Sequence, residues 1–149
     1  IIVFEEYLSR RDVWQPDCRE ACLRMAECYK ASGNISGAKN AAVRGLQYGI
    51  PIPELCCCLG SIYIDEKKYH EAVYWYKAAV SAGENRNENQ GFVRQDYSLL
   101  IPAIQLCLCY DRLGMEEEAY YWHKTAMSES PAHPSCKYNE KYFKNKRHK

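Results

Sequence analysis

A pattern that recurs along the chain limits the folds open to it. An aromatic residue is followed, nine and sixteen positions later, by two small residues. Three copies are present: Tyr29, Ala38 and Gly45; Tyr63, Ala72 and Ala79; Tyr110, Ala119 and Ala126. The copies begin 34 and 47 residues apart, so the basic period is 34 and the second interval carries a 13-residue insertion.

A 34-residue period of small and aromatic positions resembles the tetratricopeptide repeat, a helix-turn-helix unit. We therefore predict an all-α fold, a right-handed solenoid of about three helix pairs with a leading half-repeat and a C-terminal capping helix. Residues 1–16 would form the half-repeat helix and a linker. Residues 17–131 would form three repeats with a loop insertion at about 84–97, and residues 132–149 the capping helix and a basic tail. Because the pattern starts part-way through a repeat, we expect the chain to be a fragment of a longer protein.

Apolar spacing and turn residues predict where the helices lie. The expected ranges are about 18–31, 35–48, 53–64, 70–80, 97–113, 115–127 and, for the cap, 135–144. Asp17 is expected to cap the first of them. Gly60 is expected where the two helices of the second repeat cross most closely, and His123 should be a core histidine satisfied by a neighbour.

Two segments invite a functional interpretation. Residues 81–98 contain few aliphatic residues and predict a loop, with a mobile tip at Glu84–Gln90 and an ordered part, Phe92–Tyr97, packed on the helices. A solvated, tolerated insertion is the alternative. Residues 137–149 hold six Lys or Arg against one acid, which predicts a frayed, solvated end, with an anionic partner as the alternative.

Charge and cysteine usage exclude several classes. The net charge is +1, so no overall field favours nucleic acid or a membrane surface, and no apolar run approaches the ~20 residues that span a bilayer. The nine cysteines include no C-x-x-C pair, and consecutive Cys56, Cys57 and Cys58 would point about 100° apart on a helix. We expect nine reduced thiols used as small hydrophobic residues, no bound metal, and a cytoplasmic location.

No catalytic motif is evident. The chain has no glycine-rich phosphate loop, no motif around a Ser or Cys nucleophile and no D-x-D pair, so we predict that it is not itself an enzyme and needs no cofactor. Solenoids bind peptides or domains on a concave surface. Standard repeat geometry predicts this surface at Glu20, Leu23, Glu27, Lys30, Glu54, Cys57, Ser61, Ile64, Asp65, Ile101, Ile104, Leu108, Asp111 and Arg112.

Three motifs go beyond a generic repeat. They are Gly91-Phe92-Val93 with Asp96-Tyr97, the run Ile101–Gly114, and Tyr138-Asn139 with Tyr142-Phe143. Together with Tyr7–Tyr29, they resemble the helical C-terminal region of bacterial family-2 glycosyltransferases, in which repeats follow a nucleotide-sugar-binding domain. The motifs are structural, so no catalytic residue carries over.

The resemblance implies a non-catalytic interaction module that positions an acceptor or pairs subunits. Its partner would be a protein or peptide, the parent catalytic domain, or a second copy that covers an apolar edge at residues 1–11. Nucleic acid and membrane insertion are not expected. The alternative, which generic repeats allow equally well, is a stand-alone tetratricopeptide scaffold or regulator unrelated to sugar transfer.

Overall fold

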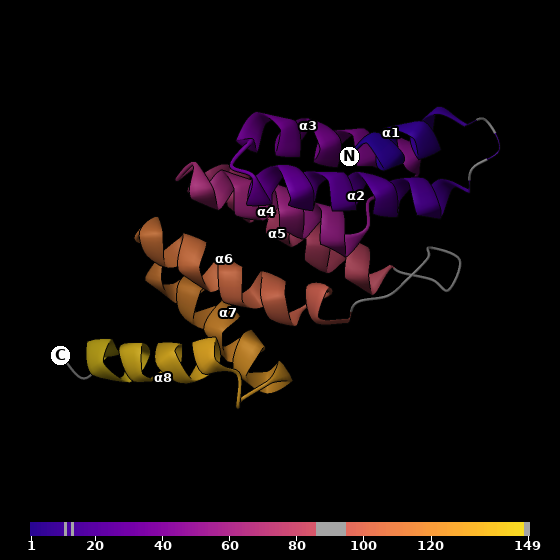
Figure 1. Cartoon of the computed structure of the whole chain (residues 1–149). Helices are drawn as coiled ribbons and strands as arrows, with labels where there is room; N and C mark the ends of the chain where they lie inside the picture. The colour runs from indigo at the N-terminus through magenta and orange to yellow at the C-terminus, as the bar shows by residue number, and fades with distance from the viewer. Residues whose placement is uncertain (11, 13, 86–94, 148–149) are drawn as a thin grey trace.

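The chain folds into helices throughout the part that the structure covers. The computed structural model describes residues 1–10, 12, 14–85 and 95–147 (Figure 1), and these residues contain no β-strand. The α-helices are α1 (Ile2–Ser9), α2 (Gln15–Ala31), α3 (Ile35–Gly45), α4 (Pro53–Asp65), α5 (Tyr69–Glu84), α6 (Leu100–Arg112), α7 (Glu116–Glu129) and α8 (Pro134–Arg147). Two short 3-10 helices, η1 (Leu46–Tyr48) and η3 (Gln95–Tyr97), follow α3 and precede α6. The predicted all-α class is confirmed.

The helices pack mainly against their neighbours in the chain. The pairs α2 with α3, α4 with α5 and α6 with α7 make the most extensive contacts, and each pair touches the next. The pairs follow one another in sequence order from one end of the molecule to the other (Figure 1), with α1 against α2 at the first end and α8 against α7 at the last. The two termini therefore lie at opposite ends.

Helices α2, α4 and α6 end in the same turn. In each, a backbone N–H just past the helix donates to the carbonyl of the repeated tyrosine, which closes the last turn. These bonds join Asn34 to Tyr29, Lys68 to Tyr63 and Met115 to Tyr110, at 2.8, 2.8 and 2.9 Å. The residue before each donor has a positive φ: 80° at Gly33, 58° at Lys67 and 74° at Gly114. The chain reverses within three residues, so the second helix folds back along the first.

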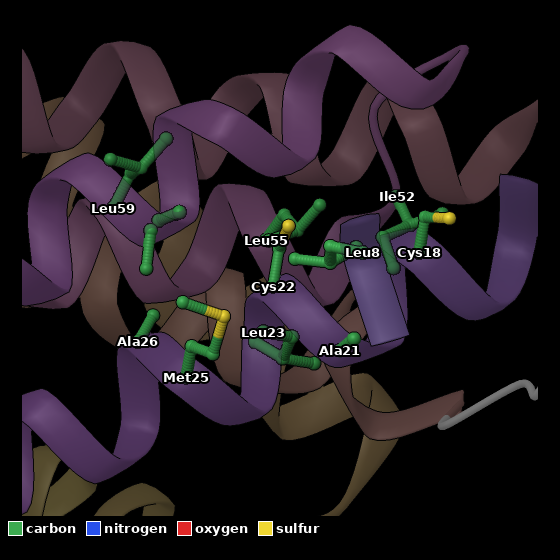
Figure 2. Packing of buried hydrophobic residues seen from close by; sticks show 12 residues of the cluster. Leu8, Cys18, Ala21, Cys22, Leu23, Met25, Ala26, Ile52, Leu55 and Leu59 are labelled. Atoms are coloured by element: carbon green, nitrogen blue, oxygen red, sulfur yellow. The ribbon is translucent and has the colours of Figure 1, made fainter. Parts of the chain in front are cut away.

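Small residues let the first and second helix pairs approach closely. Cys22, Met25 and Ala26 of α2 face Leu55 and Leu59 of α4 in the first core cluster (Figure 2). The predicted small-residue stripe of α3 is buried as expected, at Ala38, Ala41, Ala42 and Gly45. A Cβ on Gly45 would lie 2.9 Å from Leu55 Cδ1, which shows how near the backbone of α3 comes to α4.

Gly60 lies where α4 and α5, the helices of the second pair, approach each other closely, as the sequence predicts. A Cβ on this residue would lie 2.6 Å from Cε2 of Tyr76, the large buried aromatic of α5. His123 is also a core histidine as expected: it is 1% exposed, and its Nε2 lies 2.7 Å from Oε2 of Glu140 on α8. All nine cysteines are free thiols.

Several helix boundaries differ from the prediction. Helix α2 begins at Gln15 with Trp14 as its N-cap, so the expected cap at Asp17 is wrong. Pro16 lies inside the first turn, where a residue without an N–H loses no helical bond.

The ends of the predicted helices near the insertion also shift. Helix α3 tightens into η1 after Gly45, and α5 continues to Glu84, beyond its expected end. A Cβ on Gly83 would lie 2.8 Å from Cβ of Ser98, so the two ends of the insertion are adjacent. Helix α6 starts at Leu100, later than expected.

Part of the insertion lies outside the described residues. The predicted mobile tip falls largely there, as do Phe92 and Val93 of the predicted ordered part. Tyr97 is described, and it packs partly buried against the second core cluster. Its carbonyl accepts a bond from Sγ of Cys57 at 3.7 Å.

Up to Arg147 the C-terminal end is helical and not frayed as expected, and the cations of its last turn have partners. Helix α8 runs to Arg147. Nζ of Lys146 lies 2.8 Å from Glu116, and the Arg147 guanidinium lies 3.6 Å from the centre of the Tyr120 ring and 3.5 Å from Glu117. The acids that start α7 and the cations that end α8 thus fix the last helix on the array.

At the N-terminal end of the array, α1 leaves apolar side chains exposed to solvent. Ile2 and Val3 of α1 are 76% and 73% exposed, whereas Phe4 and Tyr7 pack on the first core cluster. Among the described residues, no helix combines the length and the apolar character that crossing a membrane requires.

Candidate functional site

The first helix of each pair and the last helix of the chain lie side by side. Contacts between equivalent helices join residues that are 31 or 32 positions apart. They are Lys30 Nζ to Ser61 Oγ at 2.7 Å, Asn139 Nδ2 to Cys107 Sγ at 3.9 Å and Tyr142 Oη to Asp111 Oδ1 at 2.9 Å. Because residue numbers rise together along α6 and α8, these helices run parallel. We call the surface formed by α2, α4, α6 and α8 the first-helix face.

One recess, the α4 pocket, opens where α4 meets α2 and α6. Its volume is about 240 Å³, and eleven side chains line it: Leu23, Glu27, Lys30, Glu54, Cys57, Cys58, Ser61, Tyr76, Tyr97, Ile101 and Gln105. Seven of these, from three different helices, belong to the surface that the repeat geometry predicts. The fold therefore brings together residues as distant in sequence as Leu23 and Ile101.

Polar groups at the rim of the α4 pocket are fixed by hydrogen bonds. Lys30 Nζ donates to Ser61 Oγ and lies 3.4 Å from Oδ2 of Asp65, while Ser61 Oγ donates to the carbonyl of Cys58 at 2.9 Å. Glu27 pairs with Arg24 at 2.9 Å. These contacts hold the Lys30 ammonium, with Ser61 and Asp65, at the edge of the recess.

The base of the α4 pocket is buried and largely apolar. Leu23 and Glu54 are each 2% exposed and Cys57 is 4% exposed, so they form the base of the recess and not its rim. Burial raises the pKa of the Cys57 thiol well above its usual value and that of Cys58 to about 11. Burial also raises the pKa of Tyr97. The thiols of Cys57 and Cys58 and the phenol of Tyr97 therefore stay neutral at physiological pH and act as apolar lining.

A second recess, the α6–α8 groove, runs between α6 and α8. It consists of two adjoining cavities of about 350 and about 390 Å³ that share Leu108, Tyr138 and Asn139. The remaining lining residues are Ile104, Gln105, Cys107, Asp111, Arg112, Pro134, Ser135, Tyr142 and Phe143. The predicted residues Ile104, Leu108, Asp111 and Arg112 meet here.

The α8 side of this groove was missed by sequence reasoning. Tyr138, Asn139 and Tyr142 supply it, whereas the sequence suggests only a cap. The signal that could have found them is the one-turn spacing of Tyr138 and Tyr142, which places two tyrosines on one face of a helix.

Three predicted residues lie outside both recesses. Glu20 pairs with Arg24 at 2.9 Å on the surface of α2. Ile64 packs with the second core cluster, and Asp65 ends α4 beside Lys30. The predicted surface is therefore divided between two recesses, which share Gln105 of α6.

Metal ligands and known relatives give no further assignment. Within the described part of the chain, no three His, Cys, Asp or Glu side chains lie close enough to hold a metal ion. No protein-family model, no curated protein and no solved structure matches this chain.

Proposed function

We propose that this chain is a non-catalytic protein-interaction module, a right-handed solenoid of three tetratricopeptide-type helix pairs that binds a segment of another protein on its first-helix face. The observation that carries the proposal is the turn that recurs after each first helix. The same Tyr-anchored turn closes α2, α4 and α6, and each helix pair packs against the next. Helix pairs that share a turn and contact their neighbours in sequence order are what a solenoid requires.

The two recesses suit a peptide ligand. Ligand sites are concave and mostly apolar, with a few polar groups that orient the ligand. The base of the α4 pocket combines the apolar Leu23 and Cys57 with the Glu54 carboxylate, and Lys30 and Ser61 stand at its rim. The α6–α8 groove is lined by Leu108, Tyr138 and Asn139. The second helices, in contrast, bury their small residues in the core, as at Ala41 and Ala42 of α3 and Ala72 and Ala79 of α5.

Panning a displayed peptide library against the chain tests this proposal. Ser61→Tyr fills the rim of the α4 pocket and Ser135→Tyr the end of the α6–α8 groove, while Ser128→Tyr adds the same bulk on α7, outside both recesses. Selected peptides should lose most of their affinity for at least one groove variant and keep it for Ser128→Tyr. A library that yields no binder, or binders unaffected by both groove variants, would refute the proposal.

We further propose that the module belongs to a cytoplasmic family-2 glycosyltransferase and contacts its catalytic domain, a second subunit or a protein acceptor. Support comes from the motif residues themselves, since Ile101–Gly114 spans α6 with its closing turn, and Tyr138, Asn139 and Tyr142 line the α6–α8 groove. The reading frame that encodes the chain is the test. An α/β domain with a D-x-D motif is expected before Ile1; a DNA-binding domain there, or repeats alone, would favour the stand-alone scaffold.

A further inference from the structure

We propose that the α6–α8 groove binds an extended peptide in which an apolar side chain and a carboxylate are separated by one residue. This inference rests on the proposed function and names the ligand chemistry of one of its two recesses. Four residues carry it: Leu108 and Arg112 on α6, and Tyr138 and Asn139 on α8.

The apolar half of the site lies between Leu108 and Tyr138. These residues stand on parallel, neighbouring helices and line both cavities of the groove. Tyr138 is 72% exposed, while Cys107, which lines the same cavity, is 3% exposed and contributes an apolar floor. A rigid aromatic ring loses little conformational entropy when it is covered, so an exposed tyrosine beside an apolar floor favours an aromatic or aliphatic anchor.

The charged half of the site is Arg112. The neighbouring carboxylate of Asp111 accepts a hydrogen bond from Tyr142 at 2.9 Å and lies 3.5 Å from Nζ of Lys146, so its charge is compensated within the chain. Arg112 is exposed and forms no hydrogen bond or ion pair with the residues that the structure describes. The uncompensated charge in the groove is therefore positive, and a planar guanidinium pairs well with a carboxylate.

Asn139 supplies contacts for a peptide backbone. Among the residues that the structure describes, its Nδ2 donates to Sγ of Cys107 alone, at 3.9 Å, and sulfur is a weak acceptor. A peptide carbonyl is a better acceptor for this N–H, and the side-chain oxygen can accept a peptide N–H. An extended segment leaves these backbone groups free, whereas a helix uses them internally.

The spacing along α6 sets the ligand pattern. Leu108 and Arg112 are four residues apart on one helix, a rise of about 6 Å. In an extended peptide, side chains two residues apart point the same way and are separated by about 6.6 Å. An apolar residue and an acid with one residue between them therefore match the groove.

Fluorescence anisotropy with three labelled peptides tests the inference. The peptides share glycine-serine flanks and differ in their centre: Phe-Ala-Glu, Phe-Ala-Lys or Ala-Ala-Glu. Phe-Ala-Glu should bind most tightly. Arg112→Glu should weaken it by on the order of tenfold and make Phe-Ala-Lys the preferred peptide, as expected for a charge-assisted hydrogen bond. Tyr138→Ala should weaken both Phe peptides. Lys137→Glu, the same charge change on α8 outside the groove, should alter neither.

The outcomes separate this inference from the proposed function. Equal affinity for the Glu and Lys peptides, equal losses in Arg112→Glu and Lys137→Glu, or no binding of any peptide overturns the inference. If library-selected peptides nevertheless lose affinity in Ser61→Tyr, the proposed function survives without it. Arg112 and Tyr138 are exposed, so far-UV circular dichroism should show both variants folded.

Discussion

Substitution of Gly60 by Ala tests how closely α4 and α5 approach. The new Cβ would lie 2.6, 2.8 and 2.8 Å from Cε2, Cδ2 and Cζ of Tyr76. Real Cβ contacts are essentially never shorter than 3.0 Å, so the ring or the helix must move. Tyr76 is 2% exposed and has little space into which it can retreat.

Two opposing terms decide the sign of the effect. Replacing a mid-helix glycine by alanine stabilises a helix by about 1 kcal/mol when there is room. Overpacking a core costs about 1–3 kcal/mol, and contact with three atoms of one buried ring argues for the upper end. We expect Gly60→Ala to lower the free energy of unfolding by about 2 kcal/mol. For a chain of this size, that lowers Tm by roughly 4–8 °C.

Urea unfolding followed by circular dichroism measures this change. The midpoint should fall at unchanged m-value, because the surface exposed on unfolding is the same. The control is Tyr76→Leu, which removes the ring: in that background, Gly60→Ala should cost little or stabilise the protein, giving a coupling above about 1 kcal/mol. A stabilised Gly60→Ala single variant, or a cost independent of Tyr76, would refute the close approach.

Three further predictions concern a turn, a pH response and the thiols. Lys67 has a φ of 58° where the equivalent turns have glycine, so Lys67→Gly should raise the free energy of unfolding by about 0.5–1 kcal/mol in the urea assay; a lower midpoint contradicts this. The hydrogen bond to His123 lowers the pKa of Glu140 below its usual 4.5, so this contact stabilises the fold above pH 4.5 and is lost as pH falls through the lowered pKa. Glu140→Gln should therefore destabilise the protein at neutral pH and lose less stability on acidification below pH 4.5; an unchanged pH dependence argues against the contact. In native protein, a thiol reagent should modify the exposed Cys28 first and Cys56 slowly, because burial raises the pKa of Cys56 to about 12. In unfolded protein without reductant, the reagent should titrate nine thiols, and a lower count would indicate disulfides.

Local patterns were sufficient to predict most helices of this chain. An α-helix is held by backbone hydrogen bonds between residues four apart, and turn residues end it. Gly33 and Gly114 therefore mark helix ends without knowledge of the rest of the fold. The buried stripe of α3 and the contact at Gly60 also follow from sequence, because small residues at helical spacing show where a neighbour must approach. The first of these helices was expected from about residue 18, whereas α2 begins at Gln15 with Pro16 in its first turn. A proline either ends one helix or begins another, and spacing alone does not distinguish these roles.

The candidate site depends on contacts between helices that are distant in sequence. Periodicity placed Leu108 and Arg112 together on one face of α6, but it did not reveal that Tyr138 and Asn139 of α8 line the same cavity. The sequence also suggested a frayed basic end, whereas Lys146 of α8 pairs with Glu116 of α7. Such pairs form only when whole helices take their places, because side chains some thirty residues apart meet through packing and not through local spacing. The sequence by itself therefore determined the helices and which faces they bury, and the tertiary structure alone decided which side chains share a recess.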